Sequence, residues 1–480
     1  MLTSGPPDHP EFADVGRLAR RLLNRAVQSA RTEDQSLRRL LLDYLGPEAA
    51  ALPTVSATWP AYEHVNVQVG LEAWLEAGRE RTHQVFGITG IGMMRHMEIV
   101  GIGDLLQPPN HGPFGSAGVG GVLTVAVPTG PDGQTRPCVS HGIYLVDDGG
   151  ARLAIVLQPV ERGPRPEVVV QVTGPDQDRV QAVLGEIRTL ASERSVFRGQ
   201  VISFGFEVFG AGRQVPMNFL ERPAVGRDQI VLPAEVLENI ERQVLGVGRH
   251  SGRLLASGQH LKRGVLLHGA PGTGKTHTVR YLLGRLPEAT VIVISGRALE
   301  RIREACSVAR TLQPAVIVVE DVDLIAEQRE KTRPGEHPLL FQLLNEMDGL
   351  NSGADVTFLL TTNRADLLEP ALAARPGRVD LAAELPLPDA DARRQLIRLY
   401  QGNLVLDLAD PETVIERTEG VTAAFLKELL RKAALLSCEA DPGDGPIRVT
   451  DTHLNAALDQ LLDTRNQLTR VLLGGESPPS

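Results

Sequence analysis

One glycine-rich turn limits what this chain can fold into more than any other feature. The residues "GAPGTGKT", 269–276, follow the short apolar segment "GVLLH" and lead into a segment with helical periodicity. The spacing G-x-x-x-x-G-K-T between a strand and a helix is typical of a loop that binds phosphate. We therefore expect a strand, this loop and a helix to form one continuous unit of an α/β sheet.

Short apolar segments alternate with helical ones from about Pro223 onward. The expected strands are 264–269, 291–295, 316–320, 357–361 and 381–387. Strands that alternate with helices build a parallel sheet with helical crossovers. After Asp389 the pattern is helical as far as Leu473, and the last residues, 474–480, are expected to be disordered.

The first 220 residues carry a different pattern, which predicts mixed α and β structure after a largely helical segment at 13–46. Asp147–Gly150 supplies a turn, and apolar segments on both sides of it predict a hairpin. The glycine-rich segment 111–121 is expected to be a mobile loop. The other expected elements are strands at 167–174 and 199–210 and a helix at 176–193. No catalytic triad or metal cluster is found here, so the sequence leaves the ligand of this half open.

Composition restricts the class of protein. The 480 residues are 42% hydrophobic and 22% charged, which is ordinary for a globular protein with a sizeable core. The net charge of −10 argues against nucleic acid as the main partner. One basic helix face keeps that alternative open, although a solvated face is the simpler interpretation; it carries Arg17, Arg20, Arg21 and Arg25.

The cysteines and the apolar segments indicate the compartment. Cys138, Cys306 and Cys438 are too scattered for a metal site or a disulfide framework. There is no secretory signal pattern, and the longest smooth apolar stretch, 117–127, is too short to span a bilayer. We therefore expect a soluble, cytoplasmic protein with no membrane partner.

The chemistry of the glycine-rich loop requires these residue types. Gly272 and Gly274 allow backbone N–H groups to turn inward around phosphate oxygens, in conformations that a Cβ would forbid. The helix that follows directs its positive end at the same anion. Lys275 is expected to contact the β- and γ-phosphates, and the Thr276 hydroxyl is expected to ligate Mg²⁺.

Two adjacent acids, the last residue of the expected strand 316–320 and the residue after it, end this strand with negative charge. Glu320 and Asp321 would lie at the carboxyl edge of the sheet, beside the phosphate loop, where a magnesium ion on a nucleotide explains them. Asn363 follows the next strand along the chain and would place an amide where it can orient an attacking water. The sequence thus predicts a site for a magnesium nucleotide.

This order of motifs resembles the AAA family of ATPases, in particular the clade of the membrane AAA proteases and the proteasomal ATPases. The resemblance covers residues 223–473. "GAPGTGKT" is similar to the Walker A loop, "VIVVED" to the Walker B strand, and Asn363 in "TTNR" to sensor 1. "RPGRVD" resembles the end of the second region of homology, "NEMDGL" (345–350) the helix end that signals between subunits, and "GVTAAFLKELLRKAAL" (420–435) the lid helix.

The resemblance implies a site and a set of roles. The cofactors would be ATP and Mg²⁺, with Thr276 as a metal ligand and Glu320 assisting the metal through water. Asp321 would be the base, Asn363 would position the nucleophile, and Arg378 would act as an arginine finger in a neighbouring subunit, which implies a ring, most often a homo-hexamer. The residues implied to bind the nucleotide are Gly269, Ala270, Pro271, Gly272, Thr273, Gly274, Lys275, Thr276, His277, Ile230 and Val231.

The implied fold is α/β, a phosphate-loop parallel sheet with a C-terminal helical lid, preceded by a helical N-terminus and an α+β domain. The expected boundaries are a helical segment and linker at 1–60, an α+β partner-binding domain at 61–222, the large nucleotide-binding subdomain at 223–388, and the helical lid with a flexible tail at 389–480.

The chain departs from the family pattern in three places. The Walker B acids are Glu then Asp rather than Asp then Glu, and the shorter side chain at 321 predicts slow to moderate hydrolysis. Leu381 stands where a second arginine finger is usual. The segment 295–314 lacks the aromatic residue that unfoldases of the family use to grip a polypeptide.

The expected function is that of an oligomeric AAA ATPase that remodels or assembles a protein partner bound by the α+β domain. No H-E-x-x-H motif is present, so the fused protease of the membrane family members is absent. Two alternatives stay open. One is a nucleotide-gated assembly module with little or no hydrolysis, and the other is an ATPase stimulated by nucleic acid.

Overall fold

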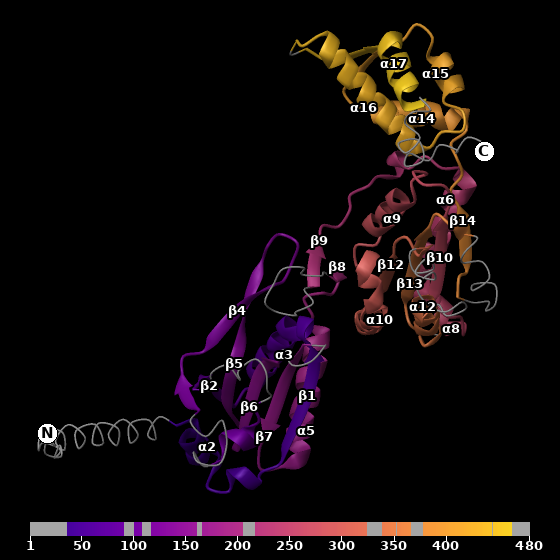
Figure 1. The fold of residues 1–480 in the computed structure, drawn as a ribbon. Coiled ribbons are helices and arrows are strands. Elements are labelled where there is room, and N and C mark those ends of the chain that lie inside the picture. The colour runs from indigo at the N-terminus through magenta and orange to yellow at the C-terminus, as the bar shows by residue number, and fades with distance from the viewer. Residues whose placement is uncertain are drawn as a thin grey trace, which may run out of the picture. The chain divides into compact units, whose positions relative to one another are not determined.

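The computed structural model describes residues 36–90, 100–107, 117–160, 166–204, 217–323, 338–351, 353–365, 378–443 and 445–462. The chain divides into two compact units (Figure 1). The first consists largely of residues up to Val196, and the second largely of residues from Phe197 onward. The helix expected at 13–46 begins outside the described residues, and its described part forms α2, Leu37–Leu45.

The first unit contains an antiparallel seven-stranded sheet. Its order is β1-β7-β6-β5-β2-β3, and β4 pairs with β5 outside this path. The strands are β1 (Thr54–Pro60), β2 (Arg81–Thr89), β3 (Gly118–Gly120), β4 (Leu123–Pro128), β5 (Thr135–Asp148), β6 (Ala151–Val160) and β7 (Glu167–Thr173). The expected hairpin is confirmed as β5 and β6, and the expected strand at 167–174 as β7. Within the segment expected to be a loop, Gly118–Gly120 instead pairs with β2.

Helices cover both faces of this sheet. Alternate residues of β6 point to opposite sides, as a pleated strand requires. Leu153 and Ile155 pack with α3 (His64–Ala77) and α5 (Gln177–Glu193), the second of which confirms the helix expected at 176–193. Ala154 and Val156 pack on the other side with α2 and α4 (Ile102–Leu105). The unit is therefore a three-layer arrangement of helices, sheet and helices (Figure 1).

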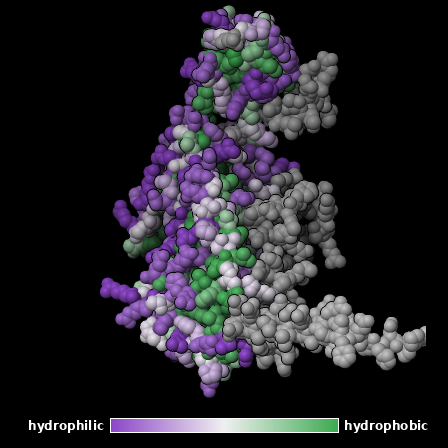
Figure 2. Space-filling view, turned by 90° about the vertical axis from the view of Figure 1, so that its left-hand side faces the viewer, coloured by the Kyte–Doolittle hydropathy of each residue, from purple (hydrophilic) through white to green (hydrophobic). Residues whose placement is uncertain are grey.

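Most of the surface shown in Figure 2 is hydrophilic, with apolar residues interspersed. In the first unit, the large exposed apolar side chains among the described residues are Val85, Leu123 and Val125. They belong to β2 and β4, and most residues of β4 are exposed. None of the described helices is both long enough and apolar enough to cross a membrane.

A half-buried acid directly before α3 makes the stability of the first unit depend on pH. Glu63 accepts a hydrogen bond from Asn66 Nδ2 at 2.6 Å, and burial raises the pKa of Glu63 from 4.5 to about 7. An acid whose pKa is higher in the folded state contributes its full stability below pH 4.5, and this contribution is lost as the pH rises through 7.

We therefore expect the unfolding free energy of the Glu63→Gln variant to fall less than that of the wild type as the pH rises. Between pH 5 and pH 8, the wild type should lose up to about 3 kcal/mol of unfolding free energy relative to this variant. Urea unfolding at both pH values measures the difference. Glu76→Gln, at an exposed position of α3, serves as the matched control. Equal pH dependence of the wild type and Glu63→Gln would contradict the assignment.

The second unit contains the expected parallel sheet. Its order is β14-β10-β13-β12-β11-β8-β9, in which only β9 runs antiparallel to its neighbour. The strands are β8 (Val201–Phe204), β9 (Met217–Leu220), β10 (Arg263–His268), β11 (Thr290–Ile294), β12 (Ala315–Val319), β13 (Val356–Thr362) and β14 (Leu381–Glu384). All five strands expected after residue 223 are confirmed. One strand, β13, lies between β10 and β12, so the Walker B strand does not pair with the strand that precedes the phosphate loop.

Two strands that precede the expected domain boundary at residue 222, β8 and β9, belong to the sheet of the second unit. Val201 and Ile202 of β8 pair with Val291 and Ile292 of β11, and β9 pairs with β8. Both β8 residues are buried. This pairing extends the parallel sheet into the region expected to belong to the α+β domain. Of the strand expected at 199–210, residues 201–204 form β8, and residues 205–210 lie outside the described residues.

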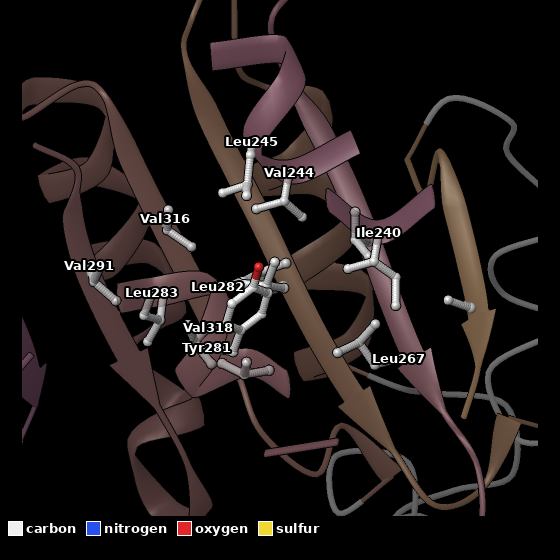
Figure 3. Packing of buried hydrophobic residues seen from close by; sticks show 14 of the residues in the cluster. Ile240, Val244, Leu245, Leu267, Tyr281, Leu282, Leu283, Val291, Val316 and Val318 are labelled. Atoms are coloured by element: carbon white, nitrogen blue, oxygen red, sulfur yellow. The ribbon is translucent and has the colours of Figure 1, made fainter. Parts of the chain in front are cut away.

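Helices pack against the sheet and form a separate lid. The helices before the lid are α6 (Ala234–Glu241), α7 (Val247–Arg249), α8 (Ser251–Ala256), α9 (Lys275–Gly284), α10 (Ile302–Thr311) and α12 (Pro338–Asp348). Figure 3 shows Ile240 of α6 and Leu282 and Leu283 of α9 packed with Leu267, Val316 and Val318 of the sheet. This core holds α9, and with it the phosphate loop, at the carboxyl end of β10.

The expected lid is built by α14 (Ala390–Gln401), α15 (Pro411–Arg417), α16 (Ala423–Ala440) and α17 (Asp451–Leu462). It also contains a short parallel pair that the helical pattern did not indicate, β15 (Val405–Asp407) and β16 (Arg448–Thr450). Phe425, Leu429 and Leu458 contribute to its own apolar core. Residues 463–480, including the end of the expected helical part and the tail, lie outside the described residues.

Candidate nucleotide site

The phosphate loop has the backbone that its glycines predict. Gly272 and Gly274 adopt φ values of 82° and 101°, in the left-handed region that glycine enters without strain. Gly274 lies directly before α9, whose first residue is Lys275. A side chain at either glycine position would be strained, so these residues form a cradle of backbone groups at the positive end of the helix.

Lys275 is held inside this loop. Its Nζ donates hydrogen bonds of 2.9 Å to the carbonyl oxygens of Gly269 and Ala270, and only 7% of the residue is exposed. Burial lowers the pKa of the Lys275 ammonium, while the carboxylates of Asp321 and Asp323 act in the opposite direction. The loop and the acids after β12 therefore share one electrostatic environment, although their strands are not paired.

The residues around Lys275 differ in exposure and in their hydrogen bonds. Thr276 and His277 are exposed on the first turn of α9. The His277 Nε2 atom lies 3.2 Å from the carbonyl oxygen of Gln229 and so ties α9 to the segment before Ile230. Thr273 Oγ1 donates to Ala270 O at 3.0 Å inside the loop.

Asp321 has an unusual backbone conformation, which helps to explain why Asp stands at the second of the two acidic positions, after Glu320. Its φ is +51°, the only positive value among the described non-glycine residues. Asp tolerates this conformation better than most residues because its short polar side chain can hydrogen-bond locally. Glu320 keeps the strand direction, with its N–H donating to Ile294 O at 3.1 Å. The turn thus falls at the second acid, where the shorter residue is favoured.

Asp323 is a site residue that the sequence reasoning missed. It is buried, with 6% exposure, and its Oδ1 accepts hydrogen bonds from Thr362 Oγ1 at 2.9 Å and from Asn363 N at 3.3 Å. Asn363 lies half-buried at the end of β13, as expected. The signal available in the sequence was the third acid in "EDVD", two residues after Asp321.

A cavity of about 400 Å³ lies between the sheet part and the lid of the second unit. Its lining includes Val231, Thr273 of the phosphate loop, and Leu396 and Ala423 of the lid. The cavity is large enough for a nucleoside, and most of these residues are apolar. Val231 thus faces the expected base pocket, whereas the Ile230 side chain is buried in the core beside the sheet.

The lid contacts the phosphate loop directly. The N–H of Ala424, in the first turn of α16, donates to Gly272 O at 3.1 Å. A Cβ built on Gly272 would lie 2.8 Å from the Ala424 Cβ and 2.9 Å from Thr422 Oγ1. Thr422 also caps α16 by accepting from Phe425 N. The lid helix therefore begins on the loop, and glycine at 272 is required by this approach as well as by its φ.

The Arg378 side chain is buried and is paired with a residue of the same subunit. Its Nε donates to both carboxylate oxygens of Asp348 at 3.1 Å, its Nη2 also contacts Asp348, and the side chain is 2% exposed. Asp348 is the last residue of α12, where "NEMDGL" was expected to end a helix. The residue implied to act on a neighbouring subunit is thus paired within its own subunit in this structure.

The donor set fits a magnesium nucleotide. Mg²⁺ prefers oxygen ligands and keeps several waters. The exposed Thr276 hydroxyl, the half-buried Glu320 and the exposed Asp321 supply such oxygens. No cluster of three or more His, Cys, Asp or Glu side chains that could hold a metal ion by itself occurs in the described part of the chain.

Comparison with known proteins places this site in a family. Residues 265–387 match the ATPase family associated with various cellular activities (AAA). The ATP-dependent zinc metalloprotease FtsH 3 of Sphaerobacter thermophilus is 30% identical over 278 residues, 56% of this chain and 56% of that protein. The proteasome-activating nucleotidase of Pyrococcus horikoshii is 30% identical over 270 residues, 54% of this chain and 66% of that protein.

A third relative is the ATP-dependent zinc metalloprotease FtsH of Mycobacterium leprae, 33% identical over 228 residues that cover 28% of its length. The chain thus spans about half, or less, of several of the relatives that it matches. The shared part contains the phosphate loop, both strands with acidic or amide ends, and β14. Residues 265–387 therefore form an AAA ATPase domain.

Proposed function

We propose that the protein hydrolyses ATP in an Mg²⁺-dependent reaction as an oligomer, and that it uses this cycle to remodel or assemble a protein partner. The observation that carries the proposal is the convergence of Lys275, Asp321 and Asn363 at the carboxyl edge of one parallel sheet. Ligands of α/β sheets bind at this edge, outside the ends of the strands.

Each residue has a role that follows from its chemistry. Lys275 and the loop N–H groups bind the phosphates, and Thr276 and Glu320 would hold Mg²⁺, the latter through water. Bound Mg²⁺ would neutralise the charge that develops on the phosphate oxygens. Asp321 accepts the proton of the attacking water, and the Asn363 amide orients that water. Val231 and the lid enclose the base in the cavity described above.

Ring formation gives Arg378 its role. A guanidinium supplied by a neighbouring subunit stabilises the charge of phosphoryl transfer. In this structure Arg378 is paired with Asp348, so it must turn outward or exchange partners when a neighbour binds. Because Leu381 occupies the position of a second finger, Arg378 would be the one residue of this kind. A homo-hexamer is the arrangement that we propose.

The proposed protein partner is based on the relatives of the AAA ATPase domain and on the first unit of this chain. The relatives' names associate them with proteolysis and with the proteasome. This sequence carries no H-E-x-x-H motif, so the partner would be acted on without cleavage by such a motif. The three-layer first unit offers a separate module for recognition, and its strands β2 and β4 expose apolar side chains. An assembly role with little turnover stays an alternative, favoured by the internal pairing of Arg378.

The test of hydrolysis is phosphate release from Mg-ATP by the wild type and by Asp321→Asn. The variant should bind Mg-ATP but release phosphate about 10²-fold more slowly, because an amide cannot accept the proton. Asp178→Asn, an exposed acid of α5, is the matched control and should behave as the wild type. Binding of ATP with equally negligible turnover in wild type and variant would favour the assembly role instead.

Stimulation by nucleic acid is checked in the same assay. Phosphate release that rises with added DNA or RNA and falls again with salt would support the nucleic-acid alternative. We expect no stimulation, since the net charge of −10 opposes binding to phosphate backbones.

A further inference from the structure

We propose that Asp323 is a positioning residue that sets Asp321 and Asn363 in register with each other, through hydrogen bonds that join the end of β12 to the end of β13. This inference rests on the proposed hydrolysis of ATP, for which Asp321 and Asn363 must lie on either side of one water. Asp323 itself would touch neither nucleotide nor water.

The hydrogen bonds form a continuous set, which we name the β12–β13 clasp. Going from β12 to β13, Asp321 N donates to Thr361 Oγ1 at 3.1 Å and Val322 N donates to Thr361 O at 2.9 Å. In the other direction, Thr362 Oγ1 and Asn363 N both donate to Asp323 Oδ1. The two strands are paired only as far as Val319 and Leu360, so the clasp continues their contact beyond the last paired residues.

The clasp explains how the left-handed Asp321 is held. A non-glycine residue with positive φ is maintained only when its surroundings determine it. The N–H groups of Asp321 and Val322 are both bound to Thr361, and Asp323 anchors the far side of the turn. Loss of the Asp323 anchor would let residues 321–323 relax, and this would move the proposed base relative to Asn363.

Burial indicates that a carboxylate at 323 has a purpose beyond packing. Thr361, Thr362 and Asp323 are all nearly inaccessible, with exposures of 1%, 0% and 6%. A buried charge is costly unless it is hydrogen-bonded and compensated, and an apolar residue would usually be at least as stable here. The compensation comes from two donors on Oδ1 and from the Lys275 ammonium: burial lowers the pKa of Lys275, and the Asp323 carboxylate acts against this lowering.

Three variants test the clasp. Asp323→Ala removes the acceptor, Thr362→Val removes one donor with little change in shape, and Asp323→Asn keeps an acceptor oxygen. We expect kcat to fall by about 10- to 100-fold in Asp323→Ala and about 10-fold in Thr362→Val, because misplacement of a reacting group by about 1 Å can have effects of this size. Affinity for a non-hydrolysable Mg-ATP analogue should change less than about threefold, and Asp323→Asn should recover most of the rate.

Non-additivity distinguishes positioning from a general loss of structure. The double variant Asp323→Ala/Thr362→Val should be no slower than Asp323→Ala, since both changes break the same bond. Asp355→Ala is the matched structural control. Asp355 precedes β13 at its opposite end and pairs with Arg263, so this variant should lower the melting temperature without lowering kcat of the folded protein.

Several results would overturn the inference. Among them are an unchanged kcat in folded Asp323→Ala, an equal loss of kcat and analogue affinity, additive effects in the double variant, and a loss in Asp323→Asn as large as in Asp323→Ala. If Asp323→Ala does not fold, the asparagine and valine variants decide the question. Wild-type turnover no higher than that of Lys275→Ala would instead refute the proposed hydrolysis, which separates the two failures.

Discussion

Lys275→Ala is expected to lower phosphate release from Mg-ATP by about 10²-fold or more. The ammonium is buried in the loop, where it donates to two carbonyl oxygens that phosphate oxygens can replace. A preorganised charge in a site that excludes water contributes far more than one in solvent, and loss of a single such donor elsewhere costs 10²–10³ in rate. A coupled assay at saturating ATP measures the effect.

The control for this variant is another lysine of the same unit. Lys432 lies on α16 and acts electrostatically on Glu428 of the same helix, so Lys432→Ala should keep the wild-type rate. Melting temperatures of both variants show whether folding is intact. A folded Lys275→Ala protein that hydrolyses ATP within about threefold of the wild type would refute the assignment of the phosphate loop as the catalytic site.

Arg378→Ala is expected to lower hydrolysis by about 10³-fold in the assembled protein, the size of effect that an arginine finger has on phosphoryl transfer. The decisive measurement mixes two inactive variants. Lys275→Ala subunits keep Arg378, and Arg378→Ala subunits keep an intact phosphate loop. If the guanidinium acts across the interface, mixed rings should regain part of the wild-type rate, since some intact sites then face an intact finger.

Asp348 and Arg398 provide the controls for this experiment. Asp348→Asn weakens the pairing that holds Arg378 in its own chain, so it should leave the assembled rate at or above that of the wild type. Arg398→Ala removes an exposed arginine of α14 and should have no effect. A mixture no more active than its two components, with assembly shown by light scattering, would mean that Arg378 acts only within its own subunit.

The sequence predicted the second unit well because its signals are local. Each of the five strands after residue 223 is a short apolar segment bounded by polar or glycine residues, and the loop at 269–276 can form only between a strand and a helix. Asn363 directly follows β13, Asp321 lies two residues after the end of β12, and Lys275 begins the helix that follows β10 and the phosphate loop. Parallel strands bring their carboxyl ends to one edge, so the approximate site followed from chain order alone.

The remaining features depend on contacts between distant residues. β8 joins the parallel sheet because Val201 and Ile202 meet β11, about 90 residues later, and no local pattern shows that pairing. Asp323 is bonded to Thr362 and Asn363, and Arg378 is paired with Asp348. The positive φ of Asp321 likewise involves a distant contact, the hydrogen bond from its N–H to Thr361 Oγ1 on β13.

The most direct test of the central claim is a crystal structure with Mg²⁺ and a non-hydrolysable ATP analogue. The account predicts the triphosphate in the cradle of Gly272 and Gly274, with Lys275 Nζ moved from the loop carbonyls to the phosphates and the base beside Val231 and Ala423. Density for the analogue at another place, or a Lys275 still bonded to Gly269 and Ala270 beside an empty loop at saturating analogue, would contradict it.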